Sequence, residues 1–381
     1  MLNIVKQLTP AIGRVKTCCL FRSSLYEGSL TRASSLVFRS KIAICRRQSS
    51  STASTGSEYS NELLLEKRYI PVRTCYDLWY DVPKAGLTFD VEYYDSRPDE
   101  SIDPGVPLVL ALHDSPGSAK DLLPVLHLLA RLGYRVIAPN FPGYGKTKWN
   151  HWKEWNVFTG AIDEKMHFVF DFQATLNIAR VDVLLGHGLG CSTCVALAGT
   201  DSKMYRSVAL LCPAEHLPLK PSRGRLRFQT AARLSQYWET LQTRPFVWFY
   251  MMLMKSSYGY SGYTTKQVID AARTIAGGRY TALQAFMVRL QVQEHPCRVV
   301  YHSVKDSKVP PDVSLKYAEL LGIKPEQFVV YQSHRKLSNP GEVTSPKGLQ
   351  IAHDTPELIE AYSKPIASMV LDLVRTLKPK R

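Results

Sequence analysis

The most constraining segment of the sequence lies near its middle, where the apolar run Val181 to Leu185 leads directly into Gly186-His187-Gly188-Leu189-Gly190. Residues 189–197 then follow a helical pattern. A short apolar run that ends in turn residues is typical of a buried strand, and a sharp turn needs glycine wherever side chains would collide. The segment therefore predicts a strand, a tight glycine turn and a helix, which together form a unit of a layered α/β fold.

Segments of strand length alternate with segments of helical period along most of the chain. We expect strands at residues 87–94, 107–112, 134–138, 181–185, 207–211, 298–302 and 327–331, and helices at residues 121–132, 162–178 and 189–197. A terminal helix is expected to start at Thr355 or Pro356. This alternation predicts one α/β domain, residues 57–381, with a mostly parallel twisted sheet and helices on both faces.

Residues 214–295 interrupt the alternation. They contain no convincing strand, only helical stretches such as residues 225–241 and 266–275. Open α/β sheets bind their ligands beyond the carboxyl ends of the strands, so we expect this insertion to form a helical lid there. The Tyr, Trp, Phe and Met content of residues 237–263 predicts a small, partly apolar ligand in a lidded pocket. Ordinary packing inside the lid explains the same composition equally well.

The start of the chain differs sharply in composition from the rest. Residues 1–50 hold nine Lys or Arg residues and a single acid, Glu27, which gives this leader a net charge of +8. Its first apolar residues are interleaved with basic ones, and a Ser-rich stretch follows Arg46 and Arg47. This composition is typical of a mitochondrial import presequence. We therefore expect residues 1–56 to form a targeting peptide and linker, and the protein to reach the mitochondrial matrix; a disordered basic tail is the alternative.

The rest of the chain carries 39 basic and 32 acidic residues without a Lys/Arg block, which argues against a nucleic-acid partner. Its longest apolar run, residues 246–254, has nine residues, whereas a membrane-spanning helix needs about 20. We therefore expect no transmembrane span. A third hypothesis, an interaction module with a protein partner, rests on the charge at the start of the lid, namely on Lys220, Arg223, Arg225 and Arg227.

Five cysteines lie beyond the leader: Cys75, Cys191, Cys194, Cys212 and Cys297. An odd and scattered set does not predict a disulfide framework. Cys191 and Cys194 form a C-x-x-C without a second pair at zinc spacing, so we interpret them as small residues that pack one face of a helix. The glycine spacing of the central turn also differs from the dinucleotide fingerprint G-x-G-x-x-G. We expect neither a metal nor a cofactor.

Three motifs lie in order at the ends of expected strands. His113-Asp114-Ser115-Pro116-Gly117-Ser118 is similar to an HGxPGS loop, Asn140-Phe141-Pro142-Gly143-Tyr144-Gly145-Lys146-Thr147 to a D-x-P-G-x-G-x-S turn, and residues 186–190 to a nucleophile elbow, G-x-S-x-G. Together they resemble the α/β-hydrolase superfamily over about residues 85–375, and the HxSPGS form resembles a branch of it found in animals. The resemblance implies the α/β-hydrolase fold.

The resemblance puts the nucleophile at the centre of the elbow, where this sequence has Gly188. Loss of the nucleophile costs about 10⁶-fold in turnover in subtilisin. Cys191 and Ser192 lie about one helical turn further on, and a misplacement of ~1 Å already costs about a hundredfold. The oxyanion site would use the backbone N–H groups of Leu189 and Ser115, which survive the loss of a side chain. We therefore expect Gly188→Ser to restore a hydroxyl without disturbing these donors.

The resemblance also implies an acid after a later strand and a histidine near the carboxyl terminus. Asp306 stands at the position of the acid, although a solvated turn aspartate is the alternative. His334 and His353 are both candidates for the base. The Gly-His pair of the family would fall nearer Lys347-Gly348-Leu349, so a third alternative is that no catalytic histidine remains.

Two functions of different classes follow. The leading hypothesis is a pseudohydrolase that keeps the pocket and lid, has lost covalent catalysis, and binds a small ligand or acts as a scaffold. The alternative is a hydrolase or lyase-type enzyme in which Asp306 and a histidine form a general base that acts with the backbone oxyanion hole and without a covalent intermediate. His113 and His187 enter neither hypothesis, because their motif positions are expected to brace the turns.

Overall fold

The computed structural model of the chain describes residues 65–76, 86–147, 158–214, 230–234, 244–257, 260, 262–276, 280–302, 311–332, 335–337, 347–352, 359 and 362–377. The chain divides into two units, Met1–Glu62 and Leu63–Arg381. Every described residue belongs to the second unit. The expected targeting segment, residues 1–56, lies outside the described residues.

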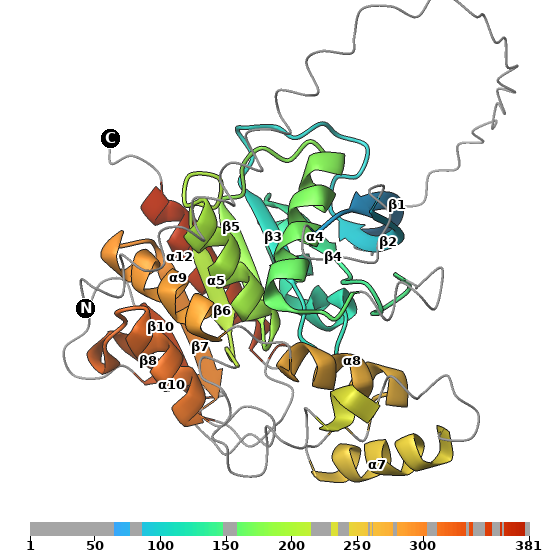
Figure 1. Cartoon of the computed structure of the whole chain (residues 1–381). Coiled ribbons are helices and arrows are strands. Elements are labelled where there is room, and N and C mark those ends of the chain that lie inside the picture. Colours follow the sequence, from blue (N-terminus) through green and yellow to red (C-terminus); the bar gives the residue numbers. More distant parts are fainter. Residues whose placement is uncertain are drawn as a thin grey trace, which may run out of the picture. The chain divides into compact units, whose positions relative to one another are not determined.

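A ten-stranded sheet organises the described part of the chain (Figure 1). Its strands are β1 (Glu66–Thr74), β2 (Leu87–Asp95), β3 (Leu108–Leu112), β4 (Arg135–Pro139), β5 (Val183–His187), β6 (Val208–Leu211), β7 (Cys297–His302), β8 (Phe328–Gln332), β9 (Arg335–Leu337) and β10 (Gly348–Ala352). In space they follow the order β1-β2-β4-β3-β5-β6-β7-β10-β8-β9. All pairings from β4 to β8 are parallel, whereas β1 with β2, β2 with β4 and β8 with β9 are antiparallel. The expected mostly parallel sheet is confirmed.

The central strands are buried on both faces, and β3 shows how. Leu108, Leu110 and Leu112 belong to one hydrophobic cluster, whereas Val109 and Ala111 belong to another. Successive side chains of a strand point to opposite faces of the sheet. A strand that is apolar at every position therefore needs helices on both faces.

Helices form these two layers. Those described are η1 (Ala119–Leu122), α2 (Leu123–Arg131), α4 (Ile162–Thr175), α5 (Gly190–Thr200), α7 (Arg244–Ser257), α8 (Thr265–Ala276), α9 (Tyr280–Val292), α10 (Pro311–Leu320), η2 (Pro325–Gln327) and α12 (Ser363–Leu377). The helices α4 and α5 pack on the face of β3 that carries Leu110, and α2 and α12 pack on the face that carries Val109. The expected start of the terminal helix, Thr355 or Pro356, lies outside the described residues.

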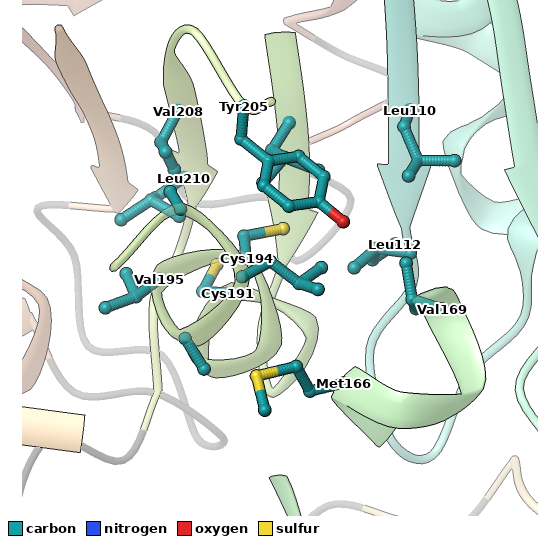
Figure 2. Packing of buried hydrophobic residues seen from close by; sticks show 14 of the residues in the cluster. Leu110, Leu112, Met166, Val169, Cys191, Cys194, Val195, Tyr205, Val208 and Leu210 are labelled. Atoms are coloured by element: carbon teal, nitrogen blue, oxygen red, sulfur yellow. The ribbon is translucent and has the colours of Figure 1, made fainter. Parts of the chain in front are cut away.

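Helix α5, which follows the elbow, is the most deeply buried of these helices. Figure 2 shows Cys191, Cys194 and Val195 of α5 among the side chains of β3, α4 and β6. Both thiols are buried and form no disulfide. Small side chains let this helix approach the sheet closely, so the C-x-x-C serves packing, as its sequence context indicates.

The insertion between β6 and β7 contributes two kinds of helix. The helices α7 and α8 share an apolar cluster that includes Met251, Val268 and, from the elbow, Leu189. Helix α9 instead packs against α5, with Leu283 and Met287 in the cluster that covers the sheet. The last part of the insertion is therefore a sheet-covering helix, and α7 and α8 are the part that packs onto the elbow.

Three strands have no counterpart in the sequence analysis: β1, β9 and β10. Gly348 and Leu349, the region expected to correspond to the family's Gly-His pair, instead begin β10, which pairs with both β7 and β8. Strand β1 contains Pro71 and several charged residues, and it lies at the edge of the sheet. Proline within a strand is tolerated at such an edge because it donates no hydrogen bond.

Candidate active site

The strand, turn and helix at the centre of the sequence form a nucleophile elbow. Strand β5 ends at His187, Gly188 follows with φ +54°, and α5 begins at Gly190. A Cβ atom on Gly190 would lie 2.5 Å from the carbonyl oxygen of Leu112, so only glycine fits there. The turn is as tight as the sequence predicts, and its central residue carries no side chain.

The carboxylate of Asp114 fills the space that a side chain on Gly188 would occupy. An ideal Cβ atom on Gly188 would lie 2.1 Å from Asp114 Oδ1 and 2.7 Å from Oδ2. Asp114 lies in the loop after β3 and is half-buried. A side chain at residue 188 and the present position of this carboxylate therefore exclude each other. The expectation that Gly188→Ser leaves the site undisturbed is wrong, because the new Cβ atom would collide with Asp114.

Asp114 Oδ1 also accepts hydrogen bonds from both donors of the expected oxyanion site. The backbone N–H groups of Leu189 and Ser115 each donate to it at 2.7 Å. Leu189 directly precedes α5, and a helix amino terminus favours an anion through its partial positive charge. The two expected donors are thus brought together, and the group that they bind is a carboxylate of the same chain.

His113 holds the loop that carries Asp114. Its Nε2 accepts the backbone N–H of Phe141 at 3.0 Å, and its Nδ1 lies 2.6 Å from the carbonyl oxygen of Asp114. A neutral imidazole that accepts through Nε2 carries its proton on Nδ1, so Nδ1 donates to that carbonyl. Complete burial lowers the pKa of His113 to about 3. His113 is therefore a neutral brace, in agreement with its motif position.

Ser115 connects this loop to the turn after β4 and to α8. Its Oγ is hydrogen-bonded to the hydroxyl of Tyr144, which also bonds the side chain of Thr274 in α8. Burial, reinforced by the charge of Asp270, raises the pKa of Tyr144 well above its ordinary value. A chain of neutral hydroxyl groups therefore ties α8 to the loop of Asp114.

The turn after β4 is fixed by a buried carboxylate of β2. Glu92 Oε2 accepts the side-chain amide of Asn140 at 2.8 Å and the N–H of Lys146 at 2.7 Å. Asn140 Oδ1 in turn accepts the N–H of Ala119 at 2.8 Å. An amide both donates and accepts, whereas the ionised aspartate of the family motif only accepts. Asn140 can therefore link Glu92 to the loop after β3, which the family's aspartate would not do.

The two polar side chains that follow the elbow, Cys191 and Ser192, are held against backbone carbonyls. Burial raises the pKa of the Cys191 thiol well above its ordinary value, and the thiolate is the reactive form of cysteine. Its Sγ lies 3.5 Å from the carbonyl oxygen of Leu211, and Ser192 Oγ donates to that of Ala214 at 3.4 Å. Both groups are buried and directed at backbone carbonyls.

The candidate acid and bases, Asp306, His334 and His353, lie outside the described residues. The strands that precede them in sequence are described. Asp306 follows β7 and His353 follows β10, and these two strands are direct neighbours. His334 follows β8, which lies one strand further from β7. Of the two candidate bases, His353 is therefore the one whose preceding strand, β10, lies next to β7, the strand that precedes Asp306.

Within the described ranges, no three His, Cys, Asp or Glu side chains are grouped so as to hold a metal ion. No helix in the same part of the chain has both the length and the apolar character needed to cross a membrane.

Asp114 is a site residue that was not predicted from the sequence, although the sequence carries a signal for it. In the HDSPGS loop, Asp114 stands where the HGxPGS motif has glycine, and in the elbow Gly188 stands where the motif has its nucleophile. Glycine and a residue with a side chain have thus exchanged places between the two motifs. The two positions are far apart in the chain, so only their contact in space shows that the changes are reciprocal.

Comparisons with known proteins agree with this geometry. A family model described as "Alpha/beta hydrolase family" matches residues 109–333, and no curated protein matches the chain. Among solved structures, the chain is similar to the haloalkane dehalogenase DbeA-M1 loop variant from Bradyrhizobium elkanii, with 14% identity, a TM-score of 0.51, and coverage of 82% of this chain and 97% of that one. A thermophilic esterase from Thermogutta terrifontis with malate bound gives 12% identity, a TM-score of 0.52, and coverage of 82% and 100%. At these identities the structural likeness shows the fold alone.

The family match, in contrast, covers more than half of the chain, including the loop after β3, the turn after β4 and the elbow. These are the elements that the structure brings together around Asp114 and Gly188. The chain belongs to the alpha/beta hydrolase family.

Proposed function

We propose that this protein is a pseudohydrolase, which binds a small, partly apolar ligand and forms no covalent intermediate with it. One observation carries the proposal: Asp114 Oδ1 accepts the N–H groups of both Leu189 and Ser115. Gly188 adds to it, because the elbow has no side chain that could attack a substrate.

Acyl transfer develops negative charge on the oxyanion of a tetrahedral intermediate. Removal of one oxyanion donor costs about 3 to 4 kcal/mol of transition-state stabilisation, and here both donors are engaged by a carboxylate. A developing oxyanion would also meet the negative charge of Asp114, and two like charges 4 Å apart near a protein surface repel by about 4 kcal/mol. Acyl transfer at this elbow therefore lacks both the nucleophile and the electrostatic support.

The same observation weakens the alternative, in which Asp306 and a histidine act as a general base with the backbone oxyanion hole. That reaction needs the donors of Leu189 and Ser115 as much as covalent catalysis does. A base mechanism would be left only with reactions that develop no negative charge beside Asp114.

The helices α7 and α8 support the ligand-binding part of the proposal. We assign to them the role of a lid, because their apolar cluster includes Leu189 beside the occupied oxyanion site. Helix α7 also leaves an exposed apolar face, formed by Phe246, Phe249 and Leu253. This face is our candidate for contact with a protein partner.

We further propose that the protein acts in the mitochondrial matrix. The support is the composition of residues 1–50, with nine basic residues against one acid. Presequences combine positive charge, serine and a shortage of acids in this way.

The test of the pseudohydrolase proposal combines a fluorophosphonate probe, which labels activated serines, with hydrolysis of p-nitrophenyl acetate. The wild-type protein should remain unlabelled and should not accelerate hydrolysis beyond a heat-denatured sample. A serine esterase at equal concentration is the positive control. Stoichiometric labelling of any serine, or ester turnover that resists dialysis and repurification, would contradict the proposal, and the labelled peptide would identify the nucleophile.

A further inference from the structure

The two oxygens of the Asp114 carboxylate have different surroundings. Oδ1 accepts two backbone N–H groups, from Leu189 and Ser115. No described residue donates a hydrogen bond to Oδ2, and Oδ2 is not among the fully buried atoms without a partner. Asp114 is half-buried, and Oδ2 is the oxygen of this carboxylate that is left to accept a hydrogen bond from a ligand.

The charge of Asp114 has no cationic partner among the described residues. Three of its titratable neighbours are neutral at pH 7, because burial lowers the pKa of His113 to about 3 and raises the pKa values of Tyr144 and Cys191 well above their ordinary values. Lys165 of α4 places its Nζ 4.9 Å from the centre of the Phe141 ring. The amino terminus of α5 offsets roughly half an elementary charge.

Because of this arrangement, the site should favour a cationic ligand, whereas an oxyanion site with free donors favours an anionic one. Empty oxyanion donors at a helix amino terminus attract anions, but here they are saturated, and the group presented to a ligand is a carboxylate oxygen. A ligand anion would be repelled. A ligand N–H group that carries positive charge would gain a charge-assisted hydrogen bond, which is roughly twice as strong as a neutral one.

The apolar surroundings define the rest of the ligand. Leu189, whose N–H holds Oδ1, places its side chain in the cluster of α7 and α8 with Met251, Tyr260 and Val268. These side chains are buried within the cluster, so the carboxylate borders an apolar part of the protein, and an apolar chain attached to the cationic group matches that environment.

We propose that Asp114 is a ligand-binding residue whose Oδ2 accepts a hydrogen bond from the protonated amino group of an amphiphilic amine. This inference rests on the proposed ligand-binding function and specifies the chemical class of the ligand. The amine is bound without a covalent bond, and no group is transferred.

Three probes of equal chain length test the inference: hexylammonium, 1-hexanol and hexanoate, with binding measured by isothermal titration calorimetry. The wild-type protein should bind hexylammonium at least tenfold more tightly than hexanoate. Asp114→Asn keeps an Oδ1 acceptor for both N–H groups but replaces Oδ2 with a donor. This variant should lose at least tenfold in hexylammonium affinity and keep its affinity for 1-hexanol within about twofold, since one charge-assisted hydrogen bond contributes about a factor of ten.

A matched control removes a carboxylate from η1, which follows this loop, without touching the elbow. Asp121 is exposed, and its Oδ2 accepts the N–H of Ser118 at 2.8 Å. Asp121→Asn should leave hexylammonium binding unchanged, which separates the role of Asp114 from a general effect of net charge.

Three results would overturn the inference: no binding of hexylammonium, equal or tighter binding of hexanoate, or an unchanged hexylammonium affinity in Asp114→Asn. None of them depends on labelling or ester turnover, so failure of this inference and failure of the pseudohydrolase proposal are distinguishable. Mass spectrometry of the protein after incubation with 1-bromohexane adds a further check. An alkyl ester on Asp114 would show that the carboxylate reacts as a nucleophile, and it would overturn both proposals.

Discussion

The carboxylate of Asp114 lies where any side chain on Gly188 would have to be, with Oδ1 2.1 Å from the position of a Cβ atom. Gly188→Ser should therefore destabilise the protein by about 2 to 4 kcal/mol, because steric overlap adds to the strain of a positive φ. Asp114→Gly removes the overlapping group, so the double variant should be at least about 1 kcal/mol more stable than the sum of the single effects.

Urea unfolding of the wild type, both single variants and the double variant measures this coupling. Additive changes in the free energy of unfolding would show that the two residues do not compete for space. The double variant also restores a hydroxyl beside unoccupied N–H donors, so its reaction with the fluorophosphonate probe reports whether a base is poised nearby.

The buried His113 should make the stability of the protein depend on pH. Its pKa in the folded protein, about 3, lies below the ordinary value of about 6.5, so the unfolded chain binds the proton more readily. Stability is then complete above about pH 6.5 and is lost as the pH falls toward 3, by up to about 1.4 kcal/mol per pH unit. Burial also lowers the pKa of His295, to about 4, which acts over nearly the same range.

His113→Asn isolates the first contribution, because His295 remains in both proteins. Urea unfolding at pH 7, 6, 5 and 4 should show a slope that is shallower in the variant by about 1 kcal/mol per pH unit below pH 6. Equal slopes would mean that His113 takes up its proton in the folded protein, contrary to its burial.

A buried ion pair joins β2 to β4. Arg135 Nη2 donates to Asp95 Oδ2 at 3.0 Å, and Nη1 donates to the carbonyl oxygens of Glu100 and Ser101. Asp95→Ala would leave the guanidinium buried without its counter-charge, so we expect a loss of about 3 to 5 kcal/mol in thermal or urea unfolding. Glu100→Ala removes the exposed pair with Arg97 and should change stability by less than about 1 kcal/mol. Similar losses in the two variants would contradict this assignment.

The proposed presequence predicts a processed amino terminus. In protein isolated from mitochondria, mass spectrometry should find the first residue beyond about residue 40, because the basic, acid-poor composition extends over residues 1–50. Recovery of intact Met1 in the mature protein would contradict the import proposal. Cytosolic protein from the same cells serves as the reference for the unprocessed chain.

The sequence predicted the central strands well, because each is a short apolar run bounded by turn residues. The expected strand at 107–112 is β3 (Leu108–Leu112), and the expected strand at 207–211 is β6 (Val208–Leu211). The edge strands were harder. In β1, charged residues and Pro71 hide the pattern because one side of an edge strand faces solvent. Strand β10 is short, begins with glycine, and takes its position from pairing with both β7 and β8.

The candidate site was predicted in part. The elbow and the two N–H donors of Leu189 and Ser115 follow from local motifs, since the backbone of a turn is determined by nearby residues. The group that accepts hydrogen bonds from those donors does not follow from local motifs, because it depends on where the side chain of Asp114 lies after the sheet has brought two distant loops together. No local pattern shows that contact. It could have been suggested only by considering together that Asp114 replaces the glycine of one motif and that Gly188 stands at the nucleophile position of the other.

Strand β10 (Gly348–Ala352) lies between β7 and β8, although both of these precede it in the chain. During synthesis, β7 and β8 therefore emerge before the strand that separates them, and each must wait with an unpaired edge until residues 348–352 leave the ribosome. Unpaired strand edges are sites of aggregation, and parallel pairings over long sequence separations form slowly. A chain truncated before Gly348 would keep the elbow and the Asp114 loop and yet expose two strand edges permanently, so premature termination should yield an insoluble product.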